Sequence, residues 1–124
     1  GLRGWIGKNV TAIHAVEFSI HHPAGFAGTC DALLDIQGKG PFIVDWKTSQ
    51  RERSEDMLTN YIDQCGGYGL GLRHLTGIVP AGALVVIARR TGAPQIRELS
   101  ELELRGAEAR FLDRCERYFS TPVS

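Results

Sequence analysis

The first half of the chain alternates between apolar and polar positions in the manner of β-strands. The segment from Val10 to Ile20 is rich in β-branched and aromatic residues, and the segment from Phe26 to Ile36 alternates more regularly. The sequence QGKG at 37–40 has the composition of a tight turn. We therefore predict that the apolar run from Pro41 to Lys47 returns beside the second strand as a hairpin.

The second half changes to a helical period. After the polar segment 48–56, apolar residues recur at spacings of three and four, at Leu58, Tyr61, Ile62, Cys65, Tyr68, Leu72 and Leu75. Glycines at 66, 67, 69 and 71 weaken this helix by up to ~1 kcal/mol each relative to alanine. Their number suggests tight packing against the sheet or a close approach by another group.

The remaining elements are two strands and a closing helix. The run from Ala83 to Ala88 is predicted to be a buried strand, and the run from Gln95 to Leu99 a short one. Ser100 and Glu103 form a capping box at the start of the last helix. The apolar stripe of that helix consists of Leu104, Ala107, Phe111, Leu112, Cys115 and Phe119.

This order of elements predicts an α/β fold in which helices flank a central mixed β-sheet. A length of 124 residues suits a single domain over 1–124. The chain opens with GLRGWIGKN, and no helix is expected before Val10, which is compatible with a fragment lacking an N-terminal helical part. No stretch is apolar enough to span a membrane, so no membrane partner is expected.

Composition narrows the function classes. The formal charge is zero, so no global positive field indicates a nucleic-acid partner, although a local basic rim remains compatible with one. The three cysteines are widely separated and include no C-x-x-C pair, which argues against a zinc ribbon or an iron–sulfur cluster. Isolated cysteines suit a reducing compartment.

The strand from Pro41 to Lys47 ends on an acid and a base either side of a tryptophan. Alternation places Asp45 and Lys47 on one face and Trp46 on the other. Asp31 lies fourteen residues earlier in the predicted partner strand. Its face is predicted to be opposite the apolar set Cys30, Ala32, Leu34 and Ile36.

The hairpin would bring Asp31 and Asp45 close together. Two carboxylates at close range repel unless a cation lies between them, and hard oxygen ligands favour Mg²⁺ or Mn²⁺. The alternative is that these charged residues lie at a solvent-exposed strand end and form no site.

Three short motifs, taken in their order along the chain, resemble those of a known protein family. The sequence G-T-C-D at 28–31, the sequence D-W-K-T-S at 45–49 and the pair Gln64-x-x-x-Tyr68 together resemble the PD-(D/E)XK nuclease superfamily. The glutamine–tyrosine pair is similar to the motif of its RecB-like branch, and IVDWKTS is most similar to mitochondrial genome maintenance exonucleases and their phage and bacterial relatives. The resemblance implies a restriction-endonuclease-like fold and a divalent-metal-dependent DNA nuclease, with an exonuclease expected.

The resemblance also implies roles. Asp31 and Asp45 would bind the metal with the backbone carbonyl of Trp46, and Lys47 would orient or activate the attacking water and stabilise the transition state. Gln64 and Tyr68 would position the lysine, the ligands or the substrate.

Members of this branch carry an upstream helix whose histidine or glutamate completes the metal site. In this chain Glu17, in the first predicted strand, would serve that role or would be a solvent-facing strand residue, and both interpretations remain open.

Further residues are candidates for nucleic-acid binding. Thr48, Ser49 and Arg51 follow the lysine and would contact phosphates, or would form an ordinary hydrophilic loop. Arg73 would lie on the nucleic-acid path or would complement the dipole of its helix.

The expected partners are DNA, single-stranded or with free ends, and a helicase or another replication or recombination protein. The expected location is the cytoplasm, in a bacterial or phage system. The competing interpretation is a nucleic-acid-binding module on the same fold that does not cleave.

Overall fold

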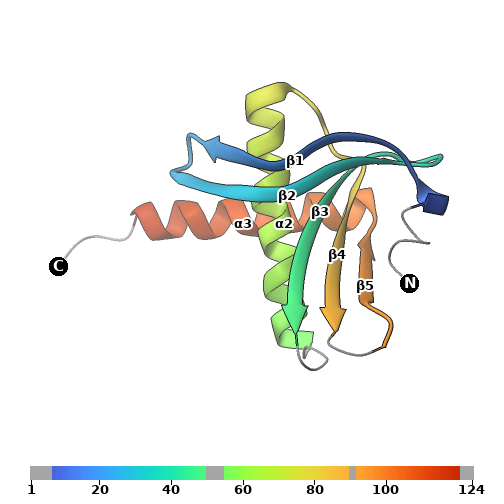
Figure 1. Cartoon of the computed structure of the whole chain (residues 1–124). Helices are drawn as coiled ribbons and strands as arrows, with labels where there is room; N and C mark the ends of the chain where they lie inside the picture. Colours follow the sequence, from blue (N-terminus) through green and yellow to red (C-terminus); the bar gives the residue numbers. More distant parts are fainter. Residues whose placement is uncertain (1–6, 50–54, 90–91, 121–124) are drawn as a thin grey trace.

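A computed structural model of the chain describes residues 7–49, 55–89 and 92–120, and Figure 1 shows their arrangement. The elements in chain order are β1 (Val10–His22), β2 (Phe26–Ile36), β3 (Gly40–Ser49), α2 (Glu55–Thr76), β4 (Gly82–Arg89), β5 (Gln95–Leu99) and α3 (Glu101–Ser120). Five strands form one sheet in the order β1-β2-β3-β4-β5. Only the β3–β4 pair among them is parallel. The predicted α/β fold with a central mixed sheet and flanking helices is confirmed.

The predicted elements match the observed ones closely, and one expectation at the N-terminus is wrong. Residues 7–9, directly before β1, are helical, although no helix was expected before Val10. Within the described residues, neither α2 nor α3 is long and apolar enough to cross a membrane.

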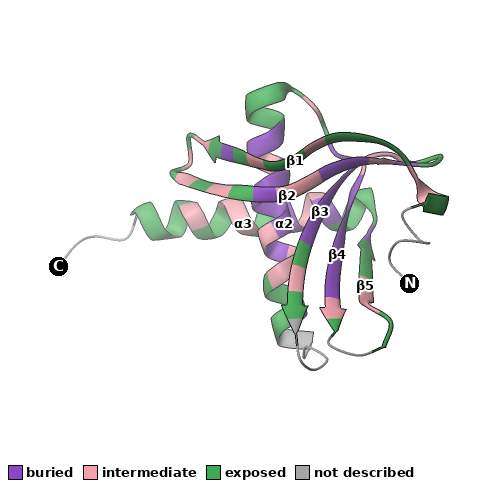
Figure 2. Cartoon of the chain, in the orientation of Figure 1, coloured by how far each residue is buried: buried purple, intermediate pink, exposed green. Residues whose placement is uncertain are grey.

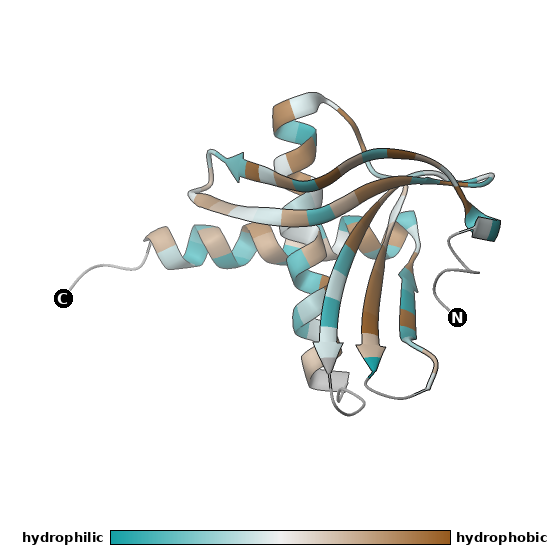
Figure 3. Cartoon of the chain, in the orientation of Figure 1, coloured by the Kyte–Doolittle hydropathy of each residue, from teal (hydrophilic) through white to brown (hydrophobic). Residues whose placement is uncertain are grey.

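The two helices lie on the same side of the sheet, behind it in the view of Figure 1. α2 connects the parallel strands β3 and β4, as a crossover helix must. The larger buried cluster lies between the sheet and the helices, and it includes Ile43 of β3, Cys65 of α2 and Leu104 of α3. A smaller cluster lies on the opposite face of the sheet and includes Val44 and Leu84. β4 is therefore buried along most of its length (Figure 2) and hydrophobic along most of it (Figure 3), as expected of a strand covered on both faces.

Strict alternation fails in β2, and the predicted apolar face is wrong at Cys30. Cys30 packs with Leu33 in the helix-side cluster, whereas Leu34 lies in the cluster on the other face. The β1–β2 register skips Glu17 and Asp31, and Glu17 has a φ of 46°. The register is the same on both sides of this gap, so no residue is inserted, but Cys30 and Leu33 share a face although they are three residues apart. Asp31 therefore lies at an irregular point of its strand.

The glycines of α2 mark where α3 crosses it. A Cβ on Gly66 would lie 2.4 Å from the backbone of Ala107, and a Cβ on Gly67 would lie 2.8 Å from the ring of Phe111. Gly71 is the exception, because its close neighbour belongs to β1. Of the two explanations offered by the sequence, close approach by another element, here mainly α3, accounts for most of these glycines.

A buried carboxylate strengthens this helix crossing. Asp63 of α2 is only 1% exposed and forms ion pairs with Arg110, at 3.0 Å, and with Arg114 of α3. Because both arginines are about half exposed, we regard their contribution to stability as modest.

Candidate active site

β3 presents two charged side chains to the helix side of the sheet. Ile43 belongs to the helix-side cluster, so alternation places Asp45 and Lys47 on that side as well. Trp46 points to the other face and is 41% exposed. The face predicted from the sequence for the acid and the lysine is the one that α2 covers.

Asp45 is a buried acid with one oxygen that the protein leaves unpaired. The residue is 1% exposed, and its Oδ2 has no hydrogen-bond partner. The pKa of Asp45 is raised to about 6, mainly by burial, with Lys47 lowering it and the neighbouring Asp31 raising it. An orphaned buried carboxylate oxygen costs free energy, which marks this atom as one that awaits a ligand.

Asp31 reaches Asp45 because the strands separate at this point. The β2–β3 register ends at the pair Ala32 and Val44, so Asp31 takes part in no backbone pairing with β3. Its Oδ2 instead accepts a hydrogen bond from the backbone N–H of Trp46, at 2.6 Å. The carboxylate of Asp31 is therefore close enough to Asp45 to raise the pKa of Asp45.

Lys47 is held by three groups. Its Nζ donates a hydrogen bond to Oε1 of Gln64 at 3.0 Å and lies 3.5 Å from Oδ1 of Asp45. The ammonium also lies 5.0 Å from the centre of the Tyr61 ring, in a cation–π contact. The sequence analysis assigned Tyr61 only to the apolar stripe, although its position three residues before Gln64 places both on one helical face.

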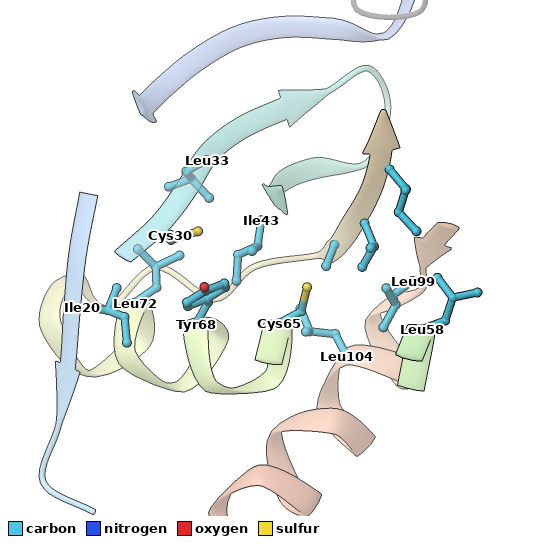
Figure 4. Packing of buried hydrophobic residues seen from close by; sticks show 13 residues of the cluster. Ile20, Cys30, Leu33, Ile43, Leu58, Cys65, Tyr68, Leu72, Leu99 and Leu104 are labelled. Atoms are coloured by element: carbon cyan, nitrogen blue, oxygen red, sulfur yellow. The ribbon is translucent and has the colours of Figure 1, made fainter. Parts of the chain in front are cut away.

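Tyr68 lies one turn beyond Gln64, beneath the carboxylates. It packs among Cys30, Ile43 and Leu72 in the helix-side cluster (Figure 4). Burial raises the pKa of the Tyr68 hydroxyl, with a further contribution from Asp45. Tyr68 is therefore neutral, and its ring packs in the core next to the site.

These residues can be tested for their fit to a divalent cation. Asp31 and Asp45 supply hard carboxylate oxygens from neighbouring strands, and the unpaired Oδ2 of Asp45 is free to act as a ligand. The pair therefore fits Mg²⁺ or Mn²⁺. Across 7–49, 55–89 and 92–120, however, no three acidic, histidine or cysteine side chains gather into a metal-binding group, and the exposed Glu17 does not join the pair.

The residues predicted to bind nucleic acid lie partly within and partly outside the described part of the chain. Thr48 is exposed near the end of β3, whereas Arg51 and the side chain of Ser49 lie outside the described residues. Arg73 forms an ion pair with Glu108, a buried residue of α3, while its own side chain remains 42% exposed. The ion pair therefore joins Arg73 of α2 to α3, and part of the arginine side chain remains exposed to solvent.

The unpaired oxygen of buried Asp45 should make the free energy of unfolding depend on pH. In the absence of metal, Asp45→Asn should stabilise the protein at pH 8 by about 1–3 kcal/mol, because it removes a buried charge. The folded-state pKa of about 6 lies above the ordinary value of 3.8. The stability that this acid provides is therefore present below the ordinary pKa and is lost as pH rises through about 6. The advantage of Asn should be absent near pH 4 and complete near pH 8 in thermal unfolding with EDTA.

Asp63 provides the matched control, since it is equally buried at 1% exposure. It is paired with two half-exposed arginines, so Asp63→Asn should destabilise the protein at pH 8 by up to about 1 kcal/mol. Equal loss of stability in both variants would contradict the description of Asp45 as a buried acid with one unpaired oxygen.

Comparisons with known proteins agree with the fold. The family model described as the PD-(D/E)XK nuclease superfamily matches residues 3–123. Among solved structures, a candidate exonuclease from Eubacterium rectale is similar with a TM-score of 0.60 and 18% identity, covering 93% of this chain and 47% of the other. The protein SSO0001 is similar with a TM-score of 0.50 and 16% identity, covering 100% of this chain and 58% of the other.

Identities this low show the fold alone. The chain spans about half the length of the two solved structures. The comparison with curated proteins gives no match.

Proposed function

The chain belongs to the PD-(D/E)XK nuclease superfamily, and from this premise we propose that it is a divalent-metal-dependent nuclease that hydrolyses DNA phosphodiester bonds from strand ends. The proposal includes Mg²⁺ or Mn²⁺ as the cofactor and membership of the RecB-like branch, to which the Gln64 and Tyr68 pair is similar. The candidate exonuclease among the similar structures favours action at ends. A helicase or another recombination protein is the proposed partner.

One observation carries the proposal. The unpaired Oδ2 of buried Asp45 lies in a cluster with the carboxylate of Asp31 and the ammonium of Lys47. A protein that needed these groups only for folding would gain by pairing or removing such an oxygen. A bound cation resolves the repulsion and supplies the missing partner.

The chain's own residues provide the rest of the chemistry. A divalent cation held by Asp31 and Asp45 would supply Lewis-acid stabilisation of the phosphate and a lowered pKa for the attacking water. Lys47 has three N–H donors, of which one is bonded to Gln64 and another points to Asp45. The remaining donor is available to orient the water or to stabilise charge on the phosphate oxygens. Gln64 and the Tyr61 ring hold the ammonium in place.

The activity can be tested with matched linear and closed-circular single strands of the same sequence, each labelled along its length. We expect Mg²⁺ or Mn²⁺ to support shortening of the linear strand and EDTA to abolish it, while the circle stays intact. Cutting of the circle would overturn action from ends. Absence of metal-dependent cleavage of either strand would overturn the nuclease.

A second candidate, a nucleic-acid-binding module that does not cleave, is favoured by one observation. In the described part of the chain only two carboxylates meet at the site, and no third acid or histidine joins them. This candidate predicts DNA binding with no cleavage at any metal concentration.

Metal binding can be measured separately from cleavage. Trp46 lies between the two site residues Asp45 and Lys47 in the sequence and is partly exposed, so its fluorescence should respond when Mn²⁺ binds. Asp45→Asn should remove the response, and Trp46→Phe should identify the contribution of the other tryptophan, Trp5. A full response in Asp45→Asn would contradict the assignment of this aspartate as a ligand.

A further inference from the structure

Three histidines meet where β1 and α2 end. His21 and His22 are the last residues of β1, and His74 lies in the last turn of α2. The ring centroid of His74 is 5.4 Å from that of His22 and 6.3 Å from that of His21. Within the described residues these side chains do not gather with others into a metal-binding group. Because histidine is the side chain that changes charge most readily near neutral pH, the cluster is a candidate for a response to pH.

His22 is bonded to the turn that follows it, residues 23–25. Its Nδ1 accepts a hydrogen bond from the backbone N–H of Ala24 at 3.0 Å, and its carbonyl accepts one from the N–H of Gly25 at 3.0 Å. A ring nitrogen that accepts a hydrogen bond carries no proton, so His22 is neutral in this arrangement. Protonation of Nδ1 would direct its new N–H at the N–H of Ala24, and this hydrogen bond would be lost.

The ring of His22 also packs against β2. It is stacked on Phe26, with the ring centroids 5.0 Å apart and the ring planes 6° from parallel. Phe26 in turn meets Phe111 of α3 edge to face, with the centroids 4.7 Å apart. His22 therefore connects the 23–25 turn to α2 through His74 and to α3 through Phe26.

The ionisable side chains around His22 come from three elements. They are His21 on β1, Arg73 and His74 on α2, and Glu108, Arg114 and Cys115 on α3. Glu108 forms an ion pair with Arg73, and Arg114 forms one with Asp63. β2 contributes no ionisable side chain over residues 26–29. The one acid in this set is therefore already paired.

These surroundings disfavour a positive charge on His22. Burial lowers the pKa of His22 below its ordinary value of 6.5, and the neighbouring His74 lowers it further. Asp113 and Glu116, on the outer half of α3, do not offset either effect. The stability that neutral His22 contributes is therefore fully present above pH 6.5, and it is lost as pH falls through 6.5 towards the lower folded-state pKa.

We propose that His22 is a pH-sensitive switch, which holds the 23–25 turn against α2 and α3 while its ring is neutral and releases the turn when the ring is protonated. Protonation removes the hydrogen bond from Ala24 and places a positive charge beside the ring of His74, so two contacts weaken together. Phe26 then loses the ring that stacks on it. Because Phe26 and Gln64 line the same hollow, release of the turn opens that hollow. The switch requires neither a metal ion nor nuclease activity.

Nuclear magnetic resonance of the whole chain in EDTA can follow the switch from pH 8 to pH 5. We expect the ring of His22 to titrate with a midpoint below pH 6.5. The backbone amide resonance of Ala24 should move with the same midpoint, because this N–H loses its acceptor. The protection of the Ala24 amide against hydrogen exchange should fall over the same range. The nuclear Overhauser contact between the rings of His22 and Phe26 should disappear below the midpoint.

His22→Asn is the counterpart that does not titrate, since an asparagine oxygen can accept a hydrogen bond from the N–H two residues later. The Ala24 amide of this variant should keep one position across the whole pH range. His74→Gln removes the neighbouring imidazole and should raise the midpoint of His22. The matched control is His14→Gln, also on β1, whose ring pairs with Asp35 instead, and it should leave both titrations unchanged.

An Ala24 amide that does not follow the titration of His22 would overturn the switch, and so would a midpoint at or above pH 6.5. An Ala24 response of wild-type size in His22→Asn would also overturn it, because another group such as Asp45, with its pKa of about 6, would then be responsible. A ring contact between His22 and Phe26 that persists below the midpoint would show that the turn stays closed. The wild-type titration decides alone if the spectrum of His22→Asn at pH 8 shows an unfolded chain.

Discussion

Lys47→Ala is expected to lower the rate of metal-dependent DNA cleavage by roughly 100- to 1000-fold, the usual effect of removing one donor that acts on developing charge. The ammonium is fixed by Gln64 at 3.0 Å and by Asp45 at 3.5 Å, so no other cation in the described cluster can replace it. The loss should appear mainly in kcat, because the substitution removes a donor that acts on the transition state. Single-turnover cleavage of a labelled strand with Mg²⁺ measures it directly.

Lys39→Ala is the matched control for this change. Lys39 lies in the turn between β2 and β3 and pairs with Glu98 on the surface, at 2.8 Å. An exposed pair contributes ~0–1 kcal/mol, so the control should keep both activity and stability. Equal cleavage by wild type, Lys39→Ala and Lys47→Ala would remove the catalytic role of Lys47.

Gln64 is a positioning residue in this scheme, since it acts on the lysine. Gln64→Ala should reduce kcat less than Lys47→Ala does, and Gln64→Glu should restore part of the loss because a carboxylate also accepts from the ammonium. A variant at Gln64 that is as inactive as Lys47→Ala would indicate direct contact with the substrate instead.

Local patterns predicted most of the fold. The β-type alternation and the helical stripe of Leu58 to Leu75 each reported a strong local preference, and the structure confirms the elements they predicted. The face of Lys47 and Asp45 followed from alternation, because β3 is regular as far as the site.

The sequence failed where a tertiary contact overrides the local pattern. The irregularity at Glu17 and Asp31 has no local signature, so Cys30 was assigned to the wrong face. Tyr61 could have been found from its spacing to Gln64, but its contact with Lys47 depends on how α2 lies against β3.

The two buried aspartates illustrate the same limit. Asp45 and Asp63 are equally buried, and nothing local to either residue distinguishes a ligand from a structural acid. The distinction comes from partners, since Asp63 has two arginines of α3 and Asp45 keeps one oxygen unpaired. The unpaired Oδ2 therefore makes Asp45, and not Asp63, the candidate metal ligand.

Gly66→Ala is expected to destabilise the protein by about 2–4 kcal/mol and to lower Tm by roughly 10 °C. A methyl group at this position would meet the backbone of Ala107 at 2.4 Å and that of Glu108 at 2.6 Å, and backbone atoms cannot move aside as a flexible side chain can. The helices must separate, and this loss exceeds the gain of up to ~1 kcal/mol that alanine brings to a helix. Thermal unfolding monitored by circular dichroism measures the change.

Gly106→Ala supplies the control, because it places the same methyl group in α3 where the nearest atom is the flexible end of Arg110 at 3.4 Å. This variant should be as stable as wild type or more stable by up to ~1 kcal/mol. The crossing also positions Lys47, since Gly66 lies two residues after Gln64, which holds the lysine. A shift of α2 away from α3 changes the 3.0 Å contact between Gln64 and Lys47. Gly66→Ala should consequently lose cleavage activity at temperatures where it is still folded, whereas Gly106→Ala should keep it. Equal stability and activity in the two variants would show that the crossing is looser than described and that it does not set the position of Lys47.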